Sequence, residues 1–322
     1  KCLAEGGRRD TWRLDRELPQ QQEIVILKTL RWDQQYNEMF FDNQRRDALA
    51  LERLQDSPHV INVYGFCGMS AINESAGNGN LYDYIMGDYL GKKSLESKDL
   101  LIYARNISIG LADIHEIDMD HPDTDNISPM PLGMPTLLHY DFRHHNMLMT
   151  DDNRVLISDF NIAQLLRWET DEKRTCGYWW YDVCGVGSIW GTDRSPEECM
   201  DKNERVHPLT DKTEVFHLGN ILNFILSKTK FPFISQVDRP YFWVEGDDKK
   251  YEMQEASNKV RDKILNGNHP SLPPEVANSD DPAIKAMIEA RNKALTFDAS
   301  KRASARDVAN ILDKALSQIG ER

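Results

Sequence analysis

The spacing of apolar residues changes near residue 77, and this change constrains the fold more than any other feature of the sequence. Before it, "DTWRLD" and "EIVILKTL" are rich in β-forming residues and flank the polar "RELPQQQ", which predicts a hairpin. One helical pattern, residues 35–54, interrupts the strands and places Asp47, Leu51 and Leu54 on one face. After the breaker "AGNGNL", helical spacing dominates. The sequence therefore predicts an α+β fold.

Two lobes follow from this change of pattern. We expect a small β-rich lobe with one main helix at residues 1–76 and a larger helical lobe at residues 77–322, with a hinge at residues 77–80. In the second lobe, "LLIYARNISIGLADIHEI" predicts a long helix with an apolar face, and "TEVFHLGNILNFIL" predicts a helix buried on all sides. Because ligands usually bind in clefts between lobes, a ligand is expected near the hinge.

Composition excludes several classes of protein. A chain of 322 residues, 40% hydrophobic and 28% charged, is long enough to bury a sizeable core and is not disordered. Its 39 basic and 52 acidic residues give a net charge of -13, which repels nucleic acids and anionic membranes, so neither is expected as a partner. No apolar run is long enough for a membrane helix. The chain opens on "KCLAEGG" without methionine, so we expect a fragment, and an upstream signal or anchor stays open.

The five cysteines argue against a zinc site, because they form no C-x-x-C pair and have no clustered histidines. Reduced thiols in a cytoplasmic protein are the default expectation. The alternative is a protein of the secretory lumen with a bridge between Cys176 and Cys184, and the localisation stays open between the two.

The stretch from Leu137 to Gln164 carries the clearest chemistry. Asp141 and Asn146 stand five residues apart, and Asp159 follows an apolar hairpin. Carboxylate and amide oxygens are hard ligands that suit Mg²⁺, and the guanidinium of Arg143 offers donors to developing negative charge. A single Asp and Asn would more often cap a turn. The combined spacing favours convergence on metal-bound phosphates.

These residues resemble the catalytic segment of eukaryotic protein kinases. "HYDFRHHN" and "DFN" stand where that family has H-R-D-L-x-x-x-N and D-F-G. The resemblance implies a bilobal kinase-like fold in which Asp141 accepts the hydrogen bond of the substrate hydroxyl and Arg143 lies near the transferred phosphoryl group. It further implies that Asn146 and Asp159 hold Mg²⁺.

Other segments resemble the family in the same order along the chain. "VILK" is similar to the V-A-I-K strand, which makes Lys28 the partner of the α- and β-phosphates of ATP. "RSPEE" is similar to A-P-E, and Arg302 is then expected to pair with Glu197. "NESAGNGNL" is similar to the nucleotide-binding hinge, although alone it would read as a surface turn. By this resemblance Asn73 is the gatekeeper, Glu74 and Ala76 offer backbone groups to adenine, and Asn80 lies near the ribose.

The sequence also departs from the family pattern. In the expected glycine-rich loop, the best register gives Ala4, Gly6 and Arg9, so only the central glycine is kept and Gly6 is the expected phosphate contact. Nucleotide binding is then weaker, or Arg8 and Arg9 supply charge instead. The helix acid that pairs with Lys28 is Asp47 in place of Glu, and we expect Lys28 to meet Asp47 and not Glu52.

Two further departures concern the catalytic segment. Tyr140 replaces an Arg that would bind an activation-segment phosphate, so activity is not expected to require phosphorylation between Ile162 and Arg194. Asn161 replaces the last glycine of D-F-G, a mild change because Asn tolerates left-handed backbone.

Three functions remain in competition. The first is an ATP- and Mg²⁺-dependent kinase for Ser/Thr hydroxyls of a protein substrate, because D-x-R resembles the D-x-K of that branch. The second is a pseudokinase that binds nucleotide weakly or not at all, favoured by the altered glycine loop and Asp47. The third is a small-molecule phosphotransferase, against which "RSPEE" argues. The oligomeric state is not predicted.

Overall fold

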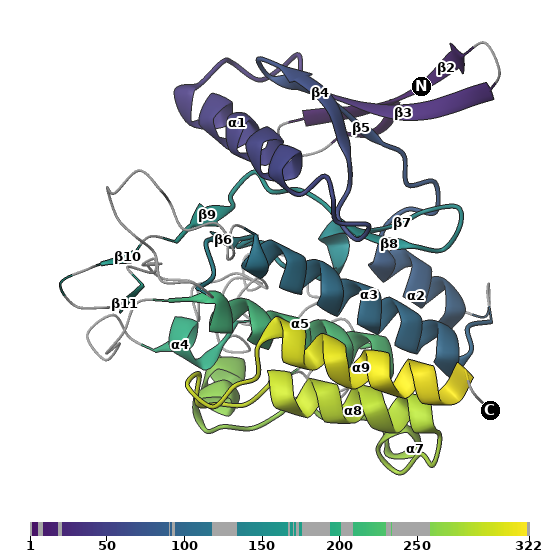
Figure 1. Ribbon diagram of the computed structural model, residues 1–322, viewed down its shortest axis with the longest axis vertical. Coiled ribbons are helices and arrows are strands. Elements are labelled where there is room, and N and C mark those ends of the chain that lie inside the picture. The colour runs from purple at the N-terminus through teal and green to yellow at the C-terminus, as the bar shows by residue number, and fades with distance from the viewer. Residues whose placement is uncertain are drawn as a thin grey trace, which may run out of the picture. The chain divides into compact units, whose positions relative to one another are not determined.

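The computed structural model has the α+β architecture that the sequence predicts (Figure 1). Its contacts divide the chain into two compact units, Lys1–Tyr84 with His139–Leu165, and Ile85–Leu138 with Leu166–Arg322. The described residues are 2–5, 9–18, 21–89, 91, 94–117, 134–166, 168–169, 171, 174–175, 194–200, 209–229, 233 and 258–320.

The first unit contains a five-stranded antiparallel sheet in the order β1-β2-β3-β5-β4. Its strands are β1 (Cys2–Glu5), β2 (Arg9–Leu18), β3 (Gln21–Leu30), β4 (Val63–Cys67) and β5 (Ser70–Glu74). The predicted hairpin is confirmed, but β2 and β3 pair along their whole length, through most of the polar segment that was expected to separate them. The reason is that a strand ladder uses backbone groups and does not require apolar side chains.

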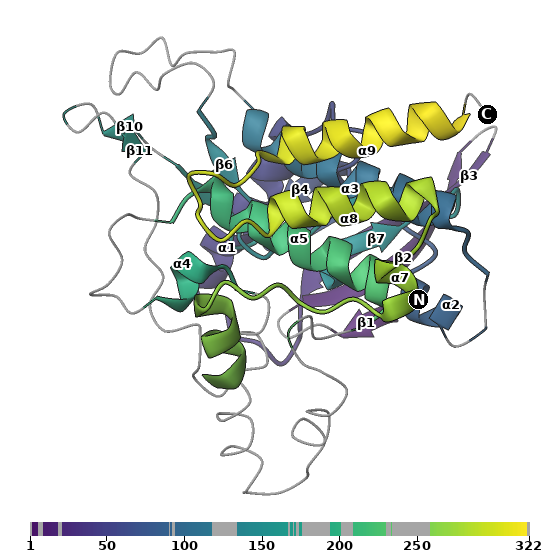
Figure 2. The same ribbon diagram turned by 90° about the horizontal axis from the view of Figure 1, so that it is seen from below.

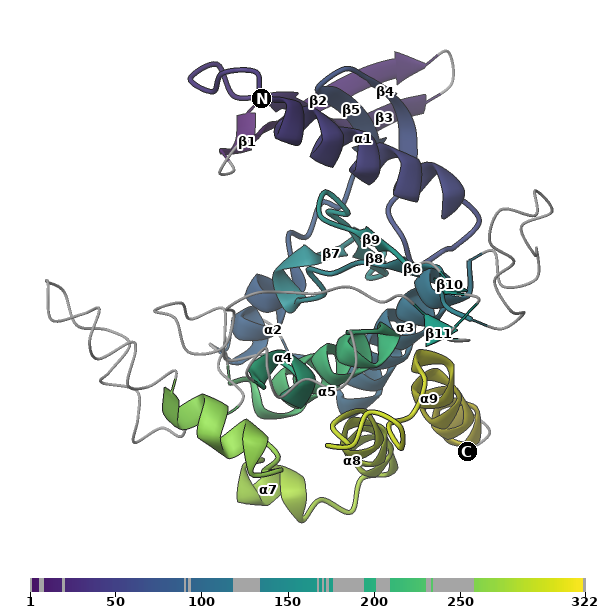
Figure 3. The same cartoon turned by 90° about the vertical axis from the view of Figure 1, so that its left-hand side faces the viewer.

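Helix α1 (Glu38–Arg53) packs against β4 (Figure 3). It begins at Glu38 because the side chain of Asn37 accepts a hydrogen bond from the backbone N–H of Met39 at 2.8 Å. The predicted inner face is confirmed, since Asp47, Leu51 and the following Leu54 are all buried. The helical periodicity therefore identified the side of α1 that faces the sheet.

The stretch with the predicted catalytic residues folds within the first unit as a short 3-10 helix and a hairpin. The 3-10 helix η1 (His144–Asn146) leads into β7 (Met147–Met149), which pairs with β8 (Val155–Ile157). Met147, Met149 and Ile157 are fully buried. The apolar hairpin between Asn146 and Asp159 is thus confirmed, and its buried side chains fix the positions of both ends.

Most of the described part of the second unit is helical. Its helices are α3 (Ser97–Glu116), α4 (Pro196–Cys199), α5 (Asp211–Ser227), a helix at residues 258–265, α7 (Pro274–Ala277), α8 (Pro282–Ala294) and α9 (Ala305–Gly320). Its short strands are β6 (Leu137–Leu138), β10 (Trp168–Glu169) and β11 (Arg174–Thr175). The described residues also form α2 (Leu81–Tyr89) and β9 (Gln164–Leu165). Helices α8 and α9 lie side by side, and both contact α3 (Figure 2). Every residue of α5 from Thr213 to Leu226 is buried, as its apolar sequence predicts. In the described part of the chain no helix combines the length and apolar character needed to cross a membrane.

The predicted pair of Glu197 and Arg302 is confirmed in the second unit. Arg302 Nη2 lies 2.7 Å from Glu197 Oε1, and Nη1 lies 3.3 Å from Oε2. The same guanidinium donates to the carbonyl oxygens of Lys212 and Thr296. With its donors occupied, this buried arginine ties α4 to α5 and to the turn before α9.

The cysteines differ in part from the expectation of reduced thiols. Cys2 and Cys67 are free and exposed, whereas Cys199, which is buried at the end of α4, is disulfide-bonded. Cys176 and Cys184, for which a bridge was considered, lie outside the described residues.

Candidate active site

Two predicted catalytic residues, Asp141 and Arg143, and the predicted metal ligand Asn146 contact one another. The amide nitrogen of Asn146 donates to the backbone oxygen of Asp141 at 2.8 Å and to its Oδ2 at 2.9 Å. Arg143 Nη2 donates to Asp141 Oδ1. The turn that allows this is closed by the backbone N–H of Asn146, which donates to the carbonyl of Arg143 at 2.9 Å. Both oxygens of the Asp141 carboxylate thus accept hydrogen bonds, which fixes its orientation.

The buried side chain of His139 stabilises this loop through two hydrogen bonds. Its Nδ1 accepts the backbone N–H of Asp141 at 3.2 Å, so Nε2 carries the proton and donates to the carbonyl of Ser158 at 2.9 Å. Ser158 in turn donates its N–H and hydroxyl to the carbonyl of Asn146. Ser158, which precedes Asp159, is therefore hydrogen-bonded directly to the loop that carries Asp141.

Asp159 adopts a left-handed backbone conformation with φ of 71°. Such a conformation is unusual for a residue other than glycine and commonly occurs at functional sites. The sequence indicates Asn161 as the residue that tolerates a left-handed backbone. In the structure φ is positive at Asp159 and not at Asn161. Phe160, which follows, is fully buried, so Asp159 stands between an anchored residue on each side.

The oxygens of this segment fit a magnesium ion that is also held by phosphates. No hydrogen bond in the described part of the chain engages Asn146 Oδ1 or Asp159 Oδ2, so both hard oxygen donors are available. No group of three or more His, Cys, Asp and Glu side chains forms a metal site there. Mg²⁺ commonly binds one or two protein oxygens and takes the rest from phosphates and water, and the donor set agrees with that mode.

The expected contact between Lys28 and Asp47 is replaced by a contact from Arg9. Arg9 Nη1 lies 3.0 Å from Asp47 Oδ2, and the backbone N–H of Phe160 donates to Asp47 Oδ1 at 2.8 Å. Within the described residues no ion pair joins Lys28 to a carboxylate. Glu52 is exposed, so Asp47 is the inward acid, as predicted.

Asp47 stays ionised although its carboxylate is only 1% exposed. Burial alone would raise its pKa, but the charges of Lys28 and Arg9 outweigh burial and lower it. Lys28 therefore acts on Asp47 through its charge, while Arg9 makes the direct hydrogen bond. Charge from Arg9 toward phosphate was one of two alternatives that the sequence left open, and its contacts with carboxylates had no signal in the sequence.

Two of the predicted hinge residues, Glu74 and Asn80, use their side chains in hydrogen bonds and an ion pair within the protein. The Glu74 side chain accepts from Asn62 Nδ2 at 3.2 Å and pairs with Arg154 at 3.1 Å. Asn80 caps α2, since its Oδ1 accepts the backbone N–H of Asp83 at 2.9 Å. No hydrogen bond of Ala76 occurs among the described residues, which leaves its backbone groups available. Gly6 lies outside the described residues.

Asn73 presents a buried acceptor on the same face of the sheet as Lys28. In the register of β3 and β5, Ile26 is opposite Asn73 and Lys28 is opposite Ala71, which places these side chains on one face. Asn73 is fully buried, and its Oδ1 has no hydrogen-bond partner in the described residues. A buried acceptor without a partner is costly, so a hydrogen bond donated by water or by a ligand would be favourable there.

Comparison with known proteins agrees with this geometry. The chain is 25% identical over 279 residues to the LRR receptor-like serine/threonine-protein kinase GSO1 of Arabidopsis thaliana, a match that covers 82% of this chain and 19% of that protein. It is also 25% identical to a probable serine/threonine-protein kinase of Dictyostelium discoideum, over 81% of this chain and 24% of that protein. The chain is related to the protein kinase superfamily. No model of a known family matches it.

A third relative of this kinase-like chain is the probable serine/threonine-protein kinase PBL28 of Arabidopsis thaliana, which is 29% identical over 136 residues. That match covers 41% of this chain and 31% of the relative. The chain thus spans between about a fifth and a third of the length of these curated relatives.

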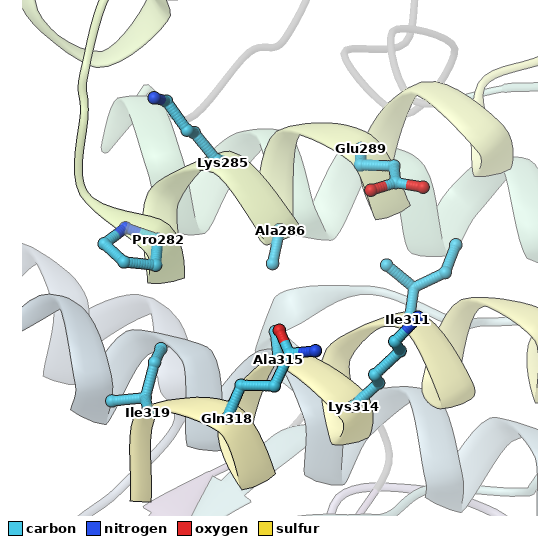
Figure 4. A pocket seen from close by; sticks show the side chains of 9 residues that line it. All are labelled: Pro282, Lys285, Ala286, Glu289, Ile311, Lys314, Ala315, Gln318 and Ile319. Carbon is cyan, nitrogen blue, oxygen red and sulfur yellow. The ribbon is translucent and has the colours of Figure 1, made fainter. Parts of the chain in front are cut away.

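A cavity of about 450 Å³ lies between α8 and α9 of the kinase-like chain (Figure 4). Its walls include Lys285 and Glu289 of α8 and Ile311 and Lys314 of α9. None of the predicted catalytic or nucleotide-binding residues lines it. The cavity therefore does not belong to the candidate active site.

Proposed function

We propose that the chain is an ATP- and Mg²⁺-dependent protein kinase that transfers the γ-phosphoryl group to Ser/Thr hydroxyls of a protein substrate. The observation that carries the proposal is the hydrogen-bonded arrangement of Asp141, Arg143 and Asn146, bound through Ser158 to the residue before Asp159. This arrangement supplies an oriented carboxylate, a cation and two available oxygen donors, which are the groups that phosphoryl transfer requires.

Each side chain has a role that its contacts support. Asp141 accepts the hydrogen bond of the attacking hydroxyl and orients it, because its carboxylate is held by Asn146 and Arg143. Arg143 donates to the transferred phosphoryl group once its bond to Asp141 rearranges. Lys28, which has no ion pair in the described residues, is available for the α- and β-phosphates.

Asn146 and Asp159 would hold Mg²⁺ through the oxygens that their present hydrogen bonds leave available. When bound there, the ion neutralises phosphate charge and orients the γ-phosphoryl group. The backbone of Ala76 and the buried Oδ1 of Asn73 are the groups offered to the adenine base. Glu74 and Asn80 also belong to this proposed nucleotide site, although their side chains serve the hinge structure.

Replacing the proposed metal ligand tests the function. We expect Asp159→Asn to lower phosphate transfer to generic Ser/Thr peptides by about a hundredfold or more, because a charged oxygen ligand is lost. Transfer is measured with radiolabelled ATP, and circular dichroism checks that the fold survives. Asp56→Asn, a change at an exposed aspartate, is the matched control and should leave the rate unchanged. A folded Asp159→Asn protein with unchanged turnover would contradict the assignment.

A pseudokinase is the second candidate, and the contacts of Arg9 favour it. Arg9 bonds to both Asp47 and Asp159, so a cation already lies against the proposed metal ligand. Thermal unfolding with ATP, with and without Mg²⁺, separates the two functions when it is compared with transfer. Stabilisation by nucleotide without any transfer would favour the pseudokinase, and transfer would exclude it.

A small-molecule phosphotransferase is the least favoured candidate. The pair of Glu197 and Arg302 supports a protein substrate, because the A-P-E-like motif borders the segment on which kinases dock peptides. A substrate screen that includes free amino alcohols beside peptides distinguishes the two classes.

A further inference from the structure

The guanidinium of Arg9 joins residues from three separate parts of the first unit. Arg9 is the first residue of β2, Gln44 and Asp47 belong to α1, and Asp159 follows β8. Nη1 lies 2.7 Å from Gln44 Oε1 and 3.0 Å from Asp47 Oδ2, while Nη2 lies 3.0 Å from Asp159 Oδ1. Only an arginine side chain can hold two carboxylates in this way, because its planar group has several donors in fixed directions.

The contacts of Arg9 form two arms, the Nη1 arm to Gln44 and Asp47 and the Nη2 arm to Asp159. These two arms differ in how strongly they are held. Asp47 is 1% exposed and Gln44 is also buried, so loss of the Nη1 arm would leave a buried carboxylate and a buried amide without that partner. The Asp159 side chain is 35% exposed, so water can replace the Nη2 arm. The Asp47 arm is therefore structural, and the Asp159 arm is exchangeable.

We propose that Arg9 is a positioning residue whose second arm is the internal counter-cation of Asp159, and that this arm competes with a divalent cation for the carboxylate. The proposal rests on the proposed function in taking Asp159 as a metal ligand. A guanidinium and a metal ion that both bind the Asp159 carboxylate are like charges and repel each other. Each therefore binds the carboxylate less strongly when the other is present. Metal binding and the Arg9–Asp159 contact therefore weaken each other.

Arg9→Lys tests the competition while keeping the charge of the chain. An ammonium is a compact cation on a flexible stem and cannot span two carboxylates as the guanidinium does. We expect Lys at this position to stay with buried Asp47 and to release Asp159. Arg13→Lys is the matched control, because Arg13 lies on the same strand and its ion pair with Asp15 is exposed on both sides.

The measurement is the binding of Mn²⁺, as a substitute for Mg²⁺, to the full chain with a non-hydrolysable ATP analogue. Electron paramagnetic resonance reports free Mn²⁺ directly and does not depend on activity. We expect Arg9→Lys to bind the Mn²⁺–nucleotide about tenfold more tightly than the wild type, the effect of one partly exposed charged hydrogen bond. Arg13→Lys should match the wild type. Equal or weaker binding by Arg9→Lys would overturn the proposal.

Failure of the proposed function and failure of this inference give different results. Tighter Mn²⁺ binding by Arg9→Lys in a protein that transfers no phosphate supports the inference and contradicts the kinase activity. Phosphate transfer by the wild type with unchanged Mn²⁺ binding in Arg9→Lys contradicts the inference alone. No Mn²⁺ binding by any of the proteins contradicts both.

A second variant covers the case in which Arg9→Lys does not fold. The double change Arg9→Met with Asp47→Leu removes both charges of the structural arm, so no buried charge is left without its partner. The same tenfold gain in Mn²⁺ affinity is expected, and its absence in this folded variant would also overturn the proposal.

Discussion

Glu198 is a buried carboxylate with three polar partners in the described part of the second unit. Its Oε2 lies 2.7 Å from His217 Nε2, its Oε1 accepts from Arg194 Nη1 at 2.9 Å, and the backbone N–H of Ser195 donates to it at 2.8 Å. Burial alone would raise the pKa of Glu198, but the charges of His217 and Arg194 outweigh burial and hold it far below the ordinary value.

This lowered pKa predicts how stability depends on pH. In the unfolded chain Glu198 titrates near its ordinary value of about 4.3, so the ionised group stabilises the fold above that pH, and the contribution is lost as pH falls toward the folded pKa. We expect Glu198→Gln to lower the free energy of unfolding by about 3 kcal/mol at neutral pH, and by progressively less below about pH 4. Urea denaturation at several pH values measures this change in the free energy of unfolding. Glu275→Gln, a change at an exposed glutamate, is the control. A difference independent of pH would contradict the assignment.

Single residues were predictable from the sequence where a local pattern fixes them. The inward position of Asp47 follows from the spacing of α1, and Glu197 was matched to Arg302 because both stand in motifs of known order. The partners of Arg9 were not predictable. A long flexible side chain that reaches α1 and Asp159 depends on how distant segments meet in space, and no local spacing encodes that.

At the scale of elements, Gly219 of α5 packs closely against the C-terminal end of α8. A Cβ atom there would lie 2.7 Å from Cγ and Cδ2 of Leu295, the residue that follows α8. Leu295 is buried and has little room to move. A glycine is therefore required for packing at this point of α5, although glycine weakens a helix by itself.

Gly219→Ala and Gly87→Ala separate packing from helix propensity. Alanine in place of glycine stabilises a helix by about 0.5–1 kcal/mol, whereas overpacking a core costs about 1–3 kcal/mol. We expect Gly219→Ala to lower the free energy of unfolding by about 1 kcal/mol or more. Gly87→Ala in α2, where a Cβ would meet no atom within 4 Å, should raise it slightly. Chemical denaturation of both proteins measures this, and a stabilised Gly219→Ala would contradict the close packing.

Elements were predictable where apolar spacing is strong and less so where backbone pairing decides. The buried helix α5 and the hairpin of β7 and β8 follow directly from their apolar residues. The lengths of β2 and β3 do not, because both strands continue through most of a polar segment that carries no apolar alternation. Side-chain patterns report which faces are buried, and backbone ladders extend beyond them.

At the scale of the whole molecule, the proposed site draws its residues from one unit although they are far apart in the sequence. Lys28, Asp47 and Asn73 come from the first part of the chain, and Asp141 and Asp159 come from the segment that joins the same unit. The lobe boundary at residues 76 and 77 stays a prediction. The helices α8 and α9, which line the cavity of Figure 4, belong to the other unit.

This division predicts where nucleotide slows hydrogen exchange. A bound ligand raises the free energy of any local unfolding that breaks its contacts with the protein. At a ligand concentration about one hundred times the Kd, the increase is about 2.7 kcal/mol. We therefore expect ATP with Mg²⁺ to slow exchange in β3, in β5 and from Asp141 to Phe160, with little change in α8 and α9. Hydrogen-exchange mass spectrometry measures it, and Asp159→Asn should lose the part that depends on Mg²⁺. Protection confined to α8 and α9 would instead assign nucleotide to the cavity between those helices, and the proposed site would then be wrong.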